Sequence, residues 1–182
     1  MIMKVLKLVI SVTLGCLLLM SCQNGESLQQ YYITSAENSD FISVDLPASL
    51  LNLEEVEINE EERETFESIK KMNLLAFQLK DGNKDEYEAE KLKVKAILNQ
   101  EKYQDLMKFS SGNIRATIKY LGDDDSIDEL IIFGTDKERG FALVRVLGKE
   151  MKPENMSGLI QAIQSSEIDG NALGQLGGLL GR

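Results

Sequence analysis

Two acidic segments of the chain, Asp81–Glu86 and Asp123–Glu129, carry closely spaced oxygen atoms of the kind that bind calcium. An EF-hand loop needs Gly at its sixth position for the sharp turn and a bidentate Glu at its twelfth. These two positions are Glu86 and Leu92 in the first segment, and Glu129 and Thr135 in the second, counted from Asp124. We therefore expect both segments to be turns and expect no metal site.

A second candidate for chemistry is Ser68-Ile69-Lys70-Lys71, which matches the Ser-x-x-Lys helix motif of penicillin-recognising enzymes. The companion Ser-Asp-Asn and Lys-Thr-Gly elements are absent from the sequence. The chain also has no His, which removes imidazole as a general base or metal ligand. It contains neither a Gly-rich phosphate loop nor a Cys/His cluster. The sequence therefore predicts no enzymatic activity and no cofactor.

The residue with an assignable chemical fate is Cys22, which ends the pattern Leu19-Met20-Ser21-Cys22. This pattern resembles the bacterial lipoprotein signal, in which the Cys thiol receives a diacylglycerol and the peptide is cut before that Cys. The new amino group is then usually acylated, for example with palmitate. We expect Cys22 to be the lipidation site and the contact with the membrane.

The residues before Cys22 have the parts of a secretory leader: basic Lys4 and Lys7, then an apolar run at 8–20. That run is shorter than the roughly twenty residues that cross a bilayer as a helix. Residues 1–21 are therefore predicted to be a lipoprotein signal peptide that is removed. Two alternatives stay open: a permanent transmembrane span, and an ordinary signal peptide cut elsewhere that leaves Cys22 as a thiol.

The location follows from the residue after the lipidation site. Gln23 stands where some bacteria use Asp to retain lipoproteins in the inner membrane. The expected location is therefore the cell envelope, lipid-anchored in the outer membrane and facing the periplasm, with surface display as an alternative.

The net charge argues against nucleic acid as a partner. The chain has 20 basic and 30 acidic residues, a formal charge of −10. Removal of the leader takes away two lysines and no acid, which leaves 18 basic against 30 acidic residues, or −12. Proteins bind phosphate backbones through basic surfaces, whereas the negative charge of an acidic domain is repelled by the phosphates. The expected partners are the membrane, through the lipid on Cys22, and another envelope protein.

The hydrophobic pattern predicts an α+β fold with two layers, a sheet of about five strands, mixed or antiparallel, with helices packed on one face. The predicted strands are Phe41–Leu46, Leu74–Lys80, Asn113–Leu121, Ile127–Thr135 and Gly140–Leu147. The predicted helices are Asn59–Met72, Asp85–Asn99, one or two turns over Tyr103–Phe109, and a last helix that begins at Pro153. Four regions follow: the signal peptide at 1–21, an anchor, tether and short helix at 22–40, the α+β domain at 41–166, and a tail at 167–182.

Three cations, Arg115, Lys119 and Arg145, are expected on the sheet face opposite the helices, which would be partly exposed to solvent. On an otherwise acidic domain they form a candidate binding face for a carboxylate-rich or anionic partner. The alternative is that they are ordinary solvated strand residues balanced by nearby acids.

The pattern as a whole resembles a family of small bacterial envelope proteins, the domain of unknown function 4252, over Leu28 to Ser165. The resemblance rests on three segments: Phe41–Leu53, Asn113–Lys119 with Asp128–Ile132, and Phe141–Gly148 before the last helix. It implies an exported, often lipidated α+β domain, and it brings no activity or site residue. The Gly/Leu-rich tail is not expected of the family, and either a disordered tail or a docking segment fits its composition.

These observations lead to two hypotheses of function. The first is a membrane-anchored lipoprotein that serves as a non-enzymatic binding or structural module of the envelope. The second is a periplasmic domain that senses a ligand or envelope stress. A pocket that brings Arg115, Lys119 and Arg145 together would favour the second.

Overall fold

The computed structural model describes residues 25–47, 60–123 and 125–156. Its helices are α2 (Leu28–Ser35), α3 (Glu60–Glu67), α4 (Lys84–Leu98) and a 3₁₀ turn, η4 (Pro153–Asn155). Its strands are β1 (Phe41–Pro47), β2 (Lys71–Gln78), β3 (Gln104–Ser111), β4 (Ile114–Asp123), β5 (Ser126–Asp136) and β6 (Gly140–Met151). The predicted signal peptide, Cys22, the part of the predicted last helix beyond residue 156 and the tail at 167–182 lie outside the described residues.

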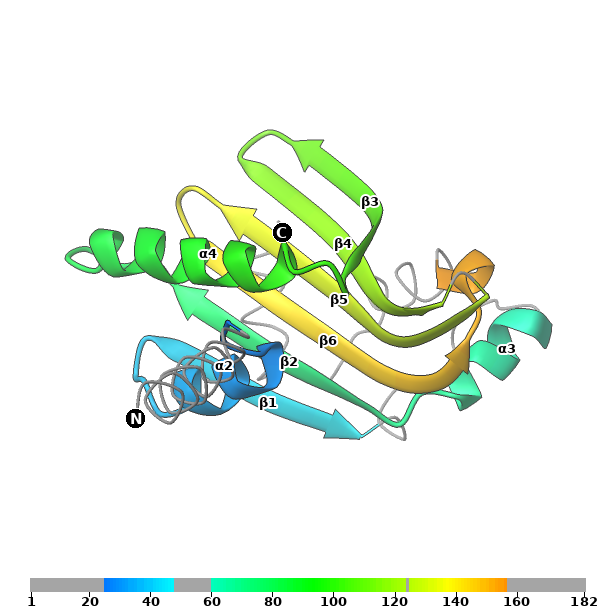
Figure 1. The fold of residues 1–182 in the computed structure, drawn as a ribbon. Coiled ribbons are helices and arrows are strands. Elements are labelled where there is room, and N and C mark those ends of the chain that lie inside the picture. The colour runs from blue at the N-terminus through cyan, green and yellow to red at the C-terminus, as the bar shows by residue number, and fades with distance from the viewer. Residues whose placement is uncertain (1–24, 48–59, 124, 157–182) are drawn as a thin grey trace, which may run out of the picture.

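The strands form one six-stranded sheet in the order β1-β2-β6-β5-β4-β3, and every neighbouring pair is antiparallel (Figure 1). The α+β class is therefore confirmed, whereas the count of about five strands was one too low. Three of the five predicted strands, Phe41–Leu46, Asn113–Leu121 and Ile127–Thr135, lie within one or two residues of their observed bounds, whereas the predicted Gly140–Leu147 ended four residues too early, because β6 continues to Met151.

The additional strand is β3, in a segment for which the sequence predicted helical turns. Gly112 and Asn113 form a two-residue loop, because Ser111 pairs with Ile114 in the adjoining strand. Gly112 has a positive φ of 56°, as tight hairpin turns require. The apolar alternation along β3 is weak because β3 is an edge strand, most of its side chains are exposed, and a bulge shifts its register between Asp105 and Met107.

The predicted helix Asn59–Met72 was too long at its C-terminal end. Helix α3 ends at Glu67, and Met72 lies in β2, where it pairs with Leu46 of β1 and Val146 of β6. The ladder bonds of a strand with a neighbour on each side outweigh the helical spacing of Phe66, Ile69 and Met72. All three are nevertheless buried, as predicted.

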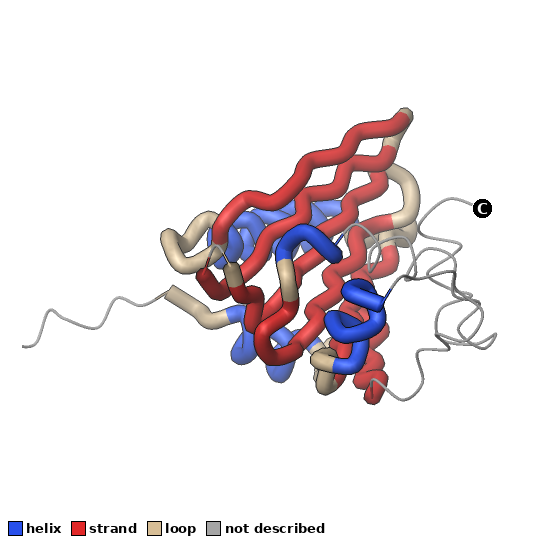
Figure 2. The backbone as a smooth tube through the Cα atoms, turned by 90° about the vertical axis from the view of Figure 1, so that its right-hand side faces the viewer, coloured by secondary structure: helices blue, strands red, loops and turns tan. Residues whose placement is uncertain are grey.

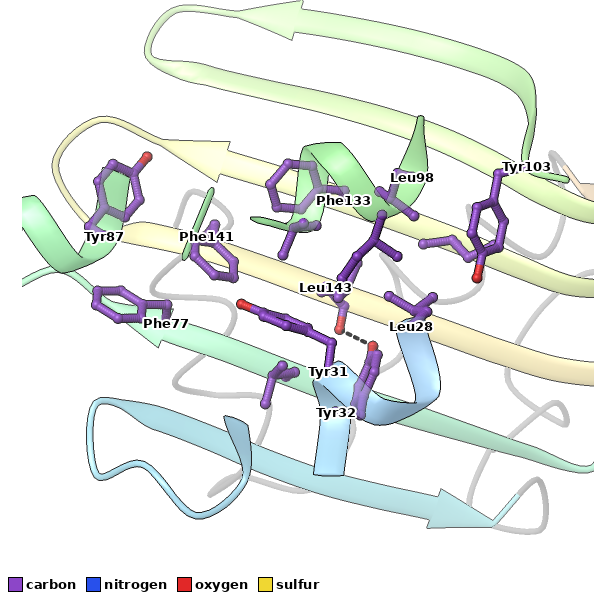
Figure 3. Packing of buried hydrophobic residues seen from close by; sticks show 14 residues of the cluster. Leu28, Tyr31, Tyr32, Phe77, Tyr87, Leu98, Tyr103, Phe133, Phe141 and Leu143 are labelled. Atoms are coloured by element: carbon purple, nitrogen blue, oxygen red, sulfur yellow. Dashed lines mark hydrogen bonds between the residues drawn. The ribbon is translucent and has the colours of Figure 1, made fainter. Parts of the chain in front are cut away.

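Helices α2 and α4 lie across one face of the sheet (Figure 1). Their apolar residues join a cluster that includes Leu75 and Phe77 of β2 and Phe141 and Leu143 of β6 (Figure 3). The rings of Phe77 and Phe141 stack with their centroids 5.5 Å apart.

Hydrogen bonds attach α2 to this core. The Tyr32 hydroxyl donates to the carbonyl oxygen of Leu143 at 2.7 Å (Figure 3), and the Tyr31 hydroxyl donates to Oε2 of Glu90 on α4 at 2.9 Å. Burial and the Glu90 carboxylate raise the pKa of Tyr31. Helix α2 is therefore tied to both the sheet and α4.

The opposite face of the sheet is also apolar at its centre, where Leu74, Ala76 and Ala142 are buried. These positions are buried on a face that was predicted to be partly exposed. Helix α3 and the 3₁₀ turn η4 lie near the end of the sheet where β2 starts and β6 ends (Figure 1 and Figure 2). Phe66 and Ile69, with Met156 after η4, join a further buried cluster that includes Met72 of β2 and Met151 of β6. Solvent reaches this face nearer β3, where Met107 and Phe109 are exposed.

Candidate anion-binding pocket

A pocket with a volume of about 300 Å³ lies between the C-terminal end of α4 and strands β3, β4 and β5. Four cations line it: Lys95 of α4, Lys108 of β3, and Arg115 and Lys119 of β4. The single carboxylate in its lining belongs to Asp105. The pocket is therefore positively charged on a chain whose net charge is −10.

Strand alternation explains why these side chains share one side of the sheet. Arg115, Thr117 and Lys119 are alternate residues of β4, paired with Thr135, Phe133 and Ile131 of β5. Phe133 and Ile131 belong to the core cluster beneath α2 and α4. Arg115 and Lys119 therefore lie on the face that the helices cover, and not on the opposite face as predicted.

Asp105 is held by two of the four cations. Its Oδ1 lies 2.7 Å from Nζ of Lys119, and its Oδ2 lies 2.8 Å from Nζ of Lys108. Hydrogen bonds from Lys108 and Lys119 lower the pKa of Asp105 to about 2. Lys119 is nearly buried and also donates to the carbonyl oxygen of Tyr103 at 3.1 Å.

The other two cations, Lys95 and Arg115, have side chains without a hydrogen bond or ion pair to any residue that the structure describes. Lys95 lies in the last turn of α4, where a cation also offsets the partial negative charge of the helix C-terminus. Arg115 is exposed, and its main-chain carbonyl accepts a hydrogen bond from the Thr135 hydroxyl at 3.3 Å. Both charged groups are thus available to an anion that enters the pocket.

Arg145, the third predicted cation, lies outside this pocket. It is on β6 beneath α2, where Nη2 is 2.8 Å from Oε2 of Glu129 and Nη1 donates to Gln29 of α2. Arg145 Nε and Glu129 Oε1 are buried without a hydrogen-bond partner among the described residues. The structure therefore brings Arg115 and Lys119 together and gives Arg145 a separate, enclosed position.

The motifs set aside at the sequence level occupy turns and element ends. Ser68 follows α3 while Lys71 begins β2, so the two side chains do not share a helix as the Ser-x-x-Lys motif requires. Asp81 and Gly82 turn the chain between β2 and α4, and the second acidic segment spans the turn from β4 into β5. Within the described parts of the chain, no group of three or more His, Cys, Asp or Glu residues could hold a metal ion.

Three charged residues of the pocket, Lys95, Asp105 and Lys108, were not predicted from the sequence. Lys108 and Asp105 lie in β3, which was predicted to be helical, so their approach to β4 was not foreseen. The turn signal Ser-Ser-Gly-Asn before β4 could have indicated a hairpin. No local pattern distinguishes Lys95 from the other lysines of α4, because its proximity to β4 depends on how the helix crosses the sheet.

Comparison with known proteins gives one match. The model of a family described as Domain of unknown function (DUF4252) matches residues 31–159, which include every residue of the pocket. No curated protein and no solved structure matches the chain. Among the helices that the structure describes, none is long and apolar enough to span a bilayer.

Proposed function

Because the chain belongs to the family of Domain of unknown function (DUF4252), whose description names no activity, we propose a function from the chain's own residues. The protein is a lipid-anchored binding module of the bacterial cell envelope and does not act as an enzyme. Its anchor is a lipid on Cys22, and its expected place is the outer membrane, facing the periplasm.

The observation that supports the anchor is the segment Leu19-Met20-Ser21-Cys22 directly after a basic and apolar leader. Each buried methylene of an acyl chain contributes about 0.8 kcal/mol, and two chains are enough for stable anchoring without a spanning helix. The mature chain, with 18 basic and 30 acidic residues and a net charge of −12, gains no attraction from anionic lipids, so the acyl chains would supply the membrane affinity.

The substitution Cys22→Ser tests the anchor. We expect the wild-type chain in the membrane fraction, with a mass increase from the diacylglycerol, and the Cys22→Ser chain, once its leader has been cut off, in the soluble fraction with an unchanged circular dichroism spectrum. Cys16→Ser is the matched control, because Cys16 lies in the leader and should leave no trace in the mature protein. A Cys22→Ser chain that is cleaved yet stays with the membrane would contradict the proposal.

A second candidate function, a ligand-sensing domain, is favoured by the pocket that contains Arg115 and Lys119. The two functions differ in what the protein binds in the cell, which is another protein for the binding module and a small ligand for the sensor. In vivo crosslinking of the lipidated chain should recover another envelope protein if the module binds proteins. Recovery of the chain alone, together with ligand binding in vitro, would favour the sensor.

A further inference from the structure

We propose that the pocket between α4 and β3–β5 binds a small organic oxyanion, a carboxylate or a phosphate monoester carried on a compact apolar group. This inference specifies the ligand of the ligand-sensing domain, the second candidate function, and rests on that function. The pocket combines an excess of cations at its walls with buried apolar side chains, which is the combination that such a ligand requires.

The charges that line the pocket favour an anionic ligand. Four cations share the pocket with one carboxylate, and two of them, Lys95 and Arg115, have side chains unpaired among the described residues. The guanidinium of Arg115 presents a planar set of donors that matches the oxygens of carboxylate and phosphate in a bidentate manner. An anion between Arg115 and Lys95 would thus be held from β4 on one side and from α4 on the other.

The size and the uncharged lining residues of the pocket favour a compact ligand with an apolar part. Leu98 and Phe133 are buried residues that line the same pocket, while the hydroxyls of Thr117 and Thr135 supply neutral donors. A volume of about 300 Å³ is at the low end for ligand pockets and equals roughly ten water molecules at ~30 Å³ each. The ligand is therefore compact, with an apolar part against Leu98 and Phe133 and an anionic group toward Arg115.

Asp105 already supplies one carboxylate to the pocket. It engages Lys108 and Lys119 and so neutralises part of the charge that a ligand would otherwise meet. It also shows that this wall of the pocket accommodates a carboxylate between two ammonium groups at distances below 3 Å. Replacing Asp105 with Asn should consequently strengthen binding of an external anion, whereas replacing a cation should weaken it.

The binding experiment uses four probes that separate charge from apolar contact. Benzoate and phenyl phosphate combine an oxyanion with a ring, inorganic phosphate lacks the ring, and benzyl alcohol lacks the charge. The mature sequence from residue 22 onward, carrying Cys22→Ser and therefore lacking both the lipid and the apolar leader, is titrated with each probe in a calorimeter. We expect benzoate, phenyl phosphate or both to bind at least about tenfold more tightly than either incomplete probe.

The comparison between benzoate and phenyl phosphate identifies the anionic group, and either preference supports the proposal. Amide chemical shifts in an NMR titration locate the site, with the largest changes expected at Lys95–Asn99, Arg115–Lys119 and Phe133–Thr135. Changes elsewhere with none in these segments would overturn it.

Three variants and one control test the residue roles. Arg115→Gln should weaken binding about tenfold or more, as expected for loss of a charge-assisted pair, and Lys95→Gln should weaken it severalfold. Asp105→Asn should strengthen it severalfold. The control Lys137→Gln removes the same charge from the exposed turn between β5 and β6, outside the pocket lining, and should leave affinity unchanged.

Several outcomes would overturn the proposal. They are no binding of any probe, equal binding of inorganic phosphate and phenyl phosphate, equal binding of benzyl alcohol and benzoate, or equal losses in Arg115→Gln and Lys137→Gln. Thermal unfolding of each variant shows whether the fold is retained. Failure here leaves the lipid anchor standing, because the anchor is measured by membrane fractionation and mass, and failure of the anchor leaves the calorimetric result unchanged.

Discussion

Arg145 and Arg115 project from the same face of one sheet, yet their surroundings differ. Arg145 lies under α2 and pairs with the buried Glu129, and its side chain is only 12% exposed to solvent. Arg115 lines the pocket beside the C-terminal part of α4, is exposed and has an unpaired guanidinium among the described residues. The difference teaches that helix coverage, and not position along a strand, separates a structural cation from one available for binding.

The carboxylates of the two regions, Glu129 beneath α2 and Asp105 in the pocket, show the same contrast in exposure. Glu129 is 6% exposed at its side chain, whereas Asp105 is 50% exposed although two lysines contact it. An ion pair removed from water depends on its partner for charge compensation, while an exposed pair is compensated by solvent as well. Removing one member should therefore be far more costly beneath α2 than in the pocket.

The largest expected effect is that of Glu129→Ala. It leaves the Arg145 guanidinium buried and unpaired, so the free energy of unfolding should fall by about 3–5 kcal/mol in urea denaturation. Asp105→Ala, the matched removal of a paired carboxylate in the pocket, should lower it by no more than about 1 kcal/mol, as for an exposed ion pair. The double variant Glu129→Met with Arg145→Met should recover most of the loss. Similar losses from Glu129→Ala and Asp105→Ala would contradict the distinction between the two regions.

A smaller effect is expected from Tyr32→Phe, which removes the hydroxyl that joins α2 to Leu143. The loss of this buried hydrogen bond should lower the free energy of unfolding by about 1–2 kcal/mol, measured by chemical denaturation. Tyr103→Phe is a matched control, because Tyr103 is buried and its hydroxyl has no hydrogen bond to the described residues. An equal loss in both variants would mean that the hydroxyl bond does not anchor α2.

The smallest effect concerns Asp105 and depends on pH. Its pKa is about 2 in the folded protein, below the usual value of 3.8, so its ionised form stabilises the fold. That stabilisation is complete above about pH 4 and disappears as the pH falls to about 2. The melting temperature of Asp105→Asn should therefore lie slightly below that of wild type at pH 7 and converge with it near pH 2. A gap that widens on acidification would contradict the assigned lysine contacts.

Much of the fold was predictable where the signal was local. Alternation along Asn113–Leu121 identified β4, and the spacing of Tyr87, Val94 and Leu98 identified the buried side of α4. The errors fall where local preference competes with sheet pairing. Met72 has helical spacing from Ile69 but is drawn into β2 by partners on both sides, and β3 is an exposed edge strand whose apolar residues do not alternate cleanly.

For the candidate site, the sequence by itself determined that Arg115, Thr117 and Lys119 share one side of a strand, because successive side chains of a strand point to opposite faces. It also determined family membership and the acidic net charge. Only the tertiary structure decided which side the helices cover, that Arg145 pairs with Glu129 beneath α2, and that Lys95 and Lys108 join Arg115 in a pocket. These outcomes depend on contacts between residues far apart in the chain, and no local period of side chains encodes where a helix crosses a sheet.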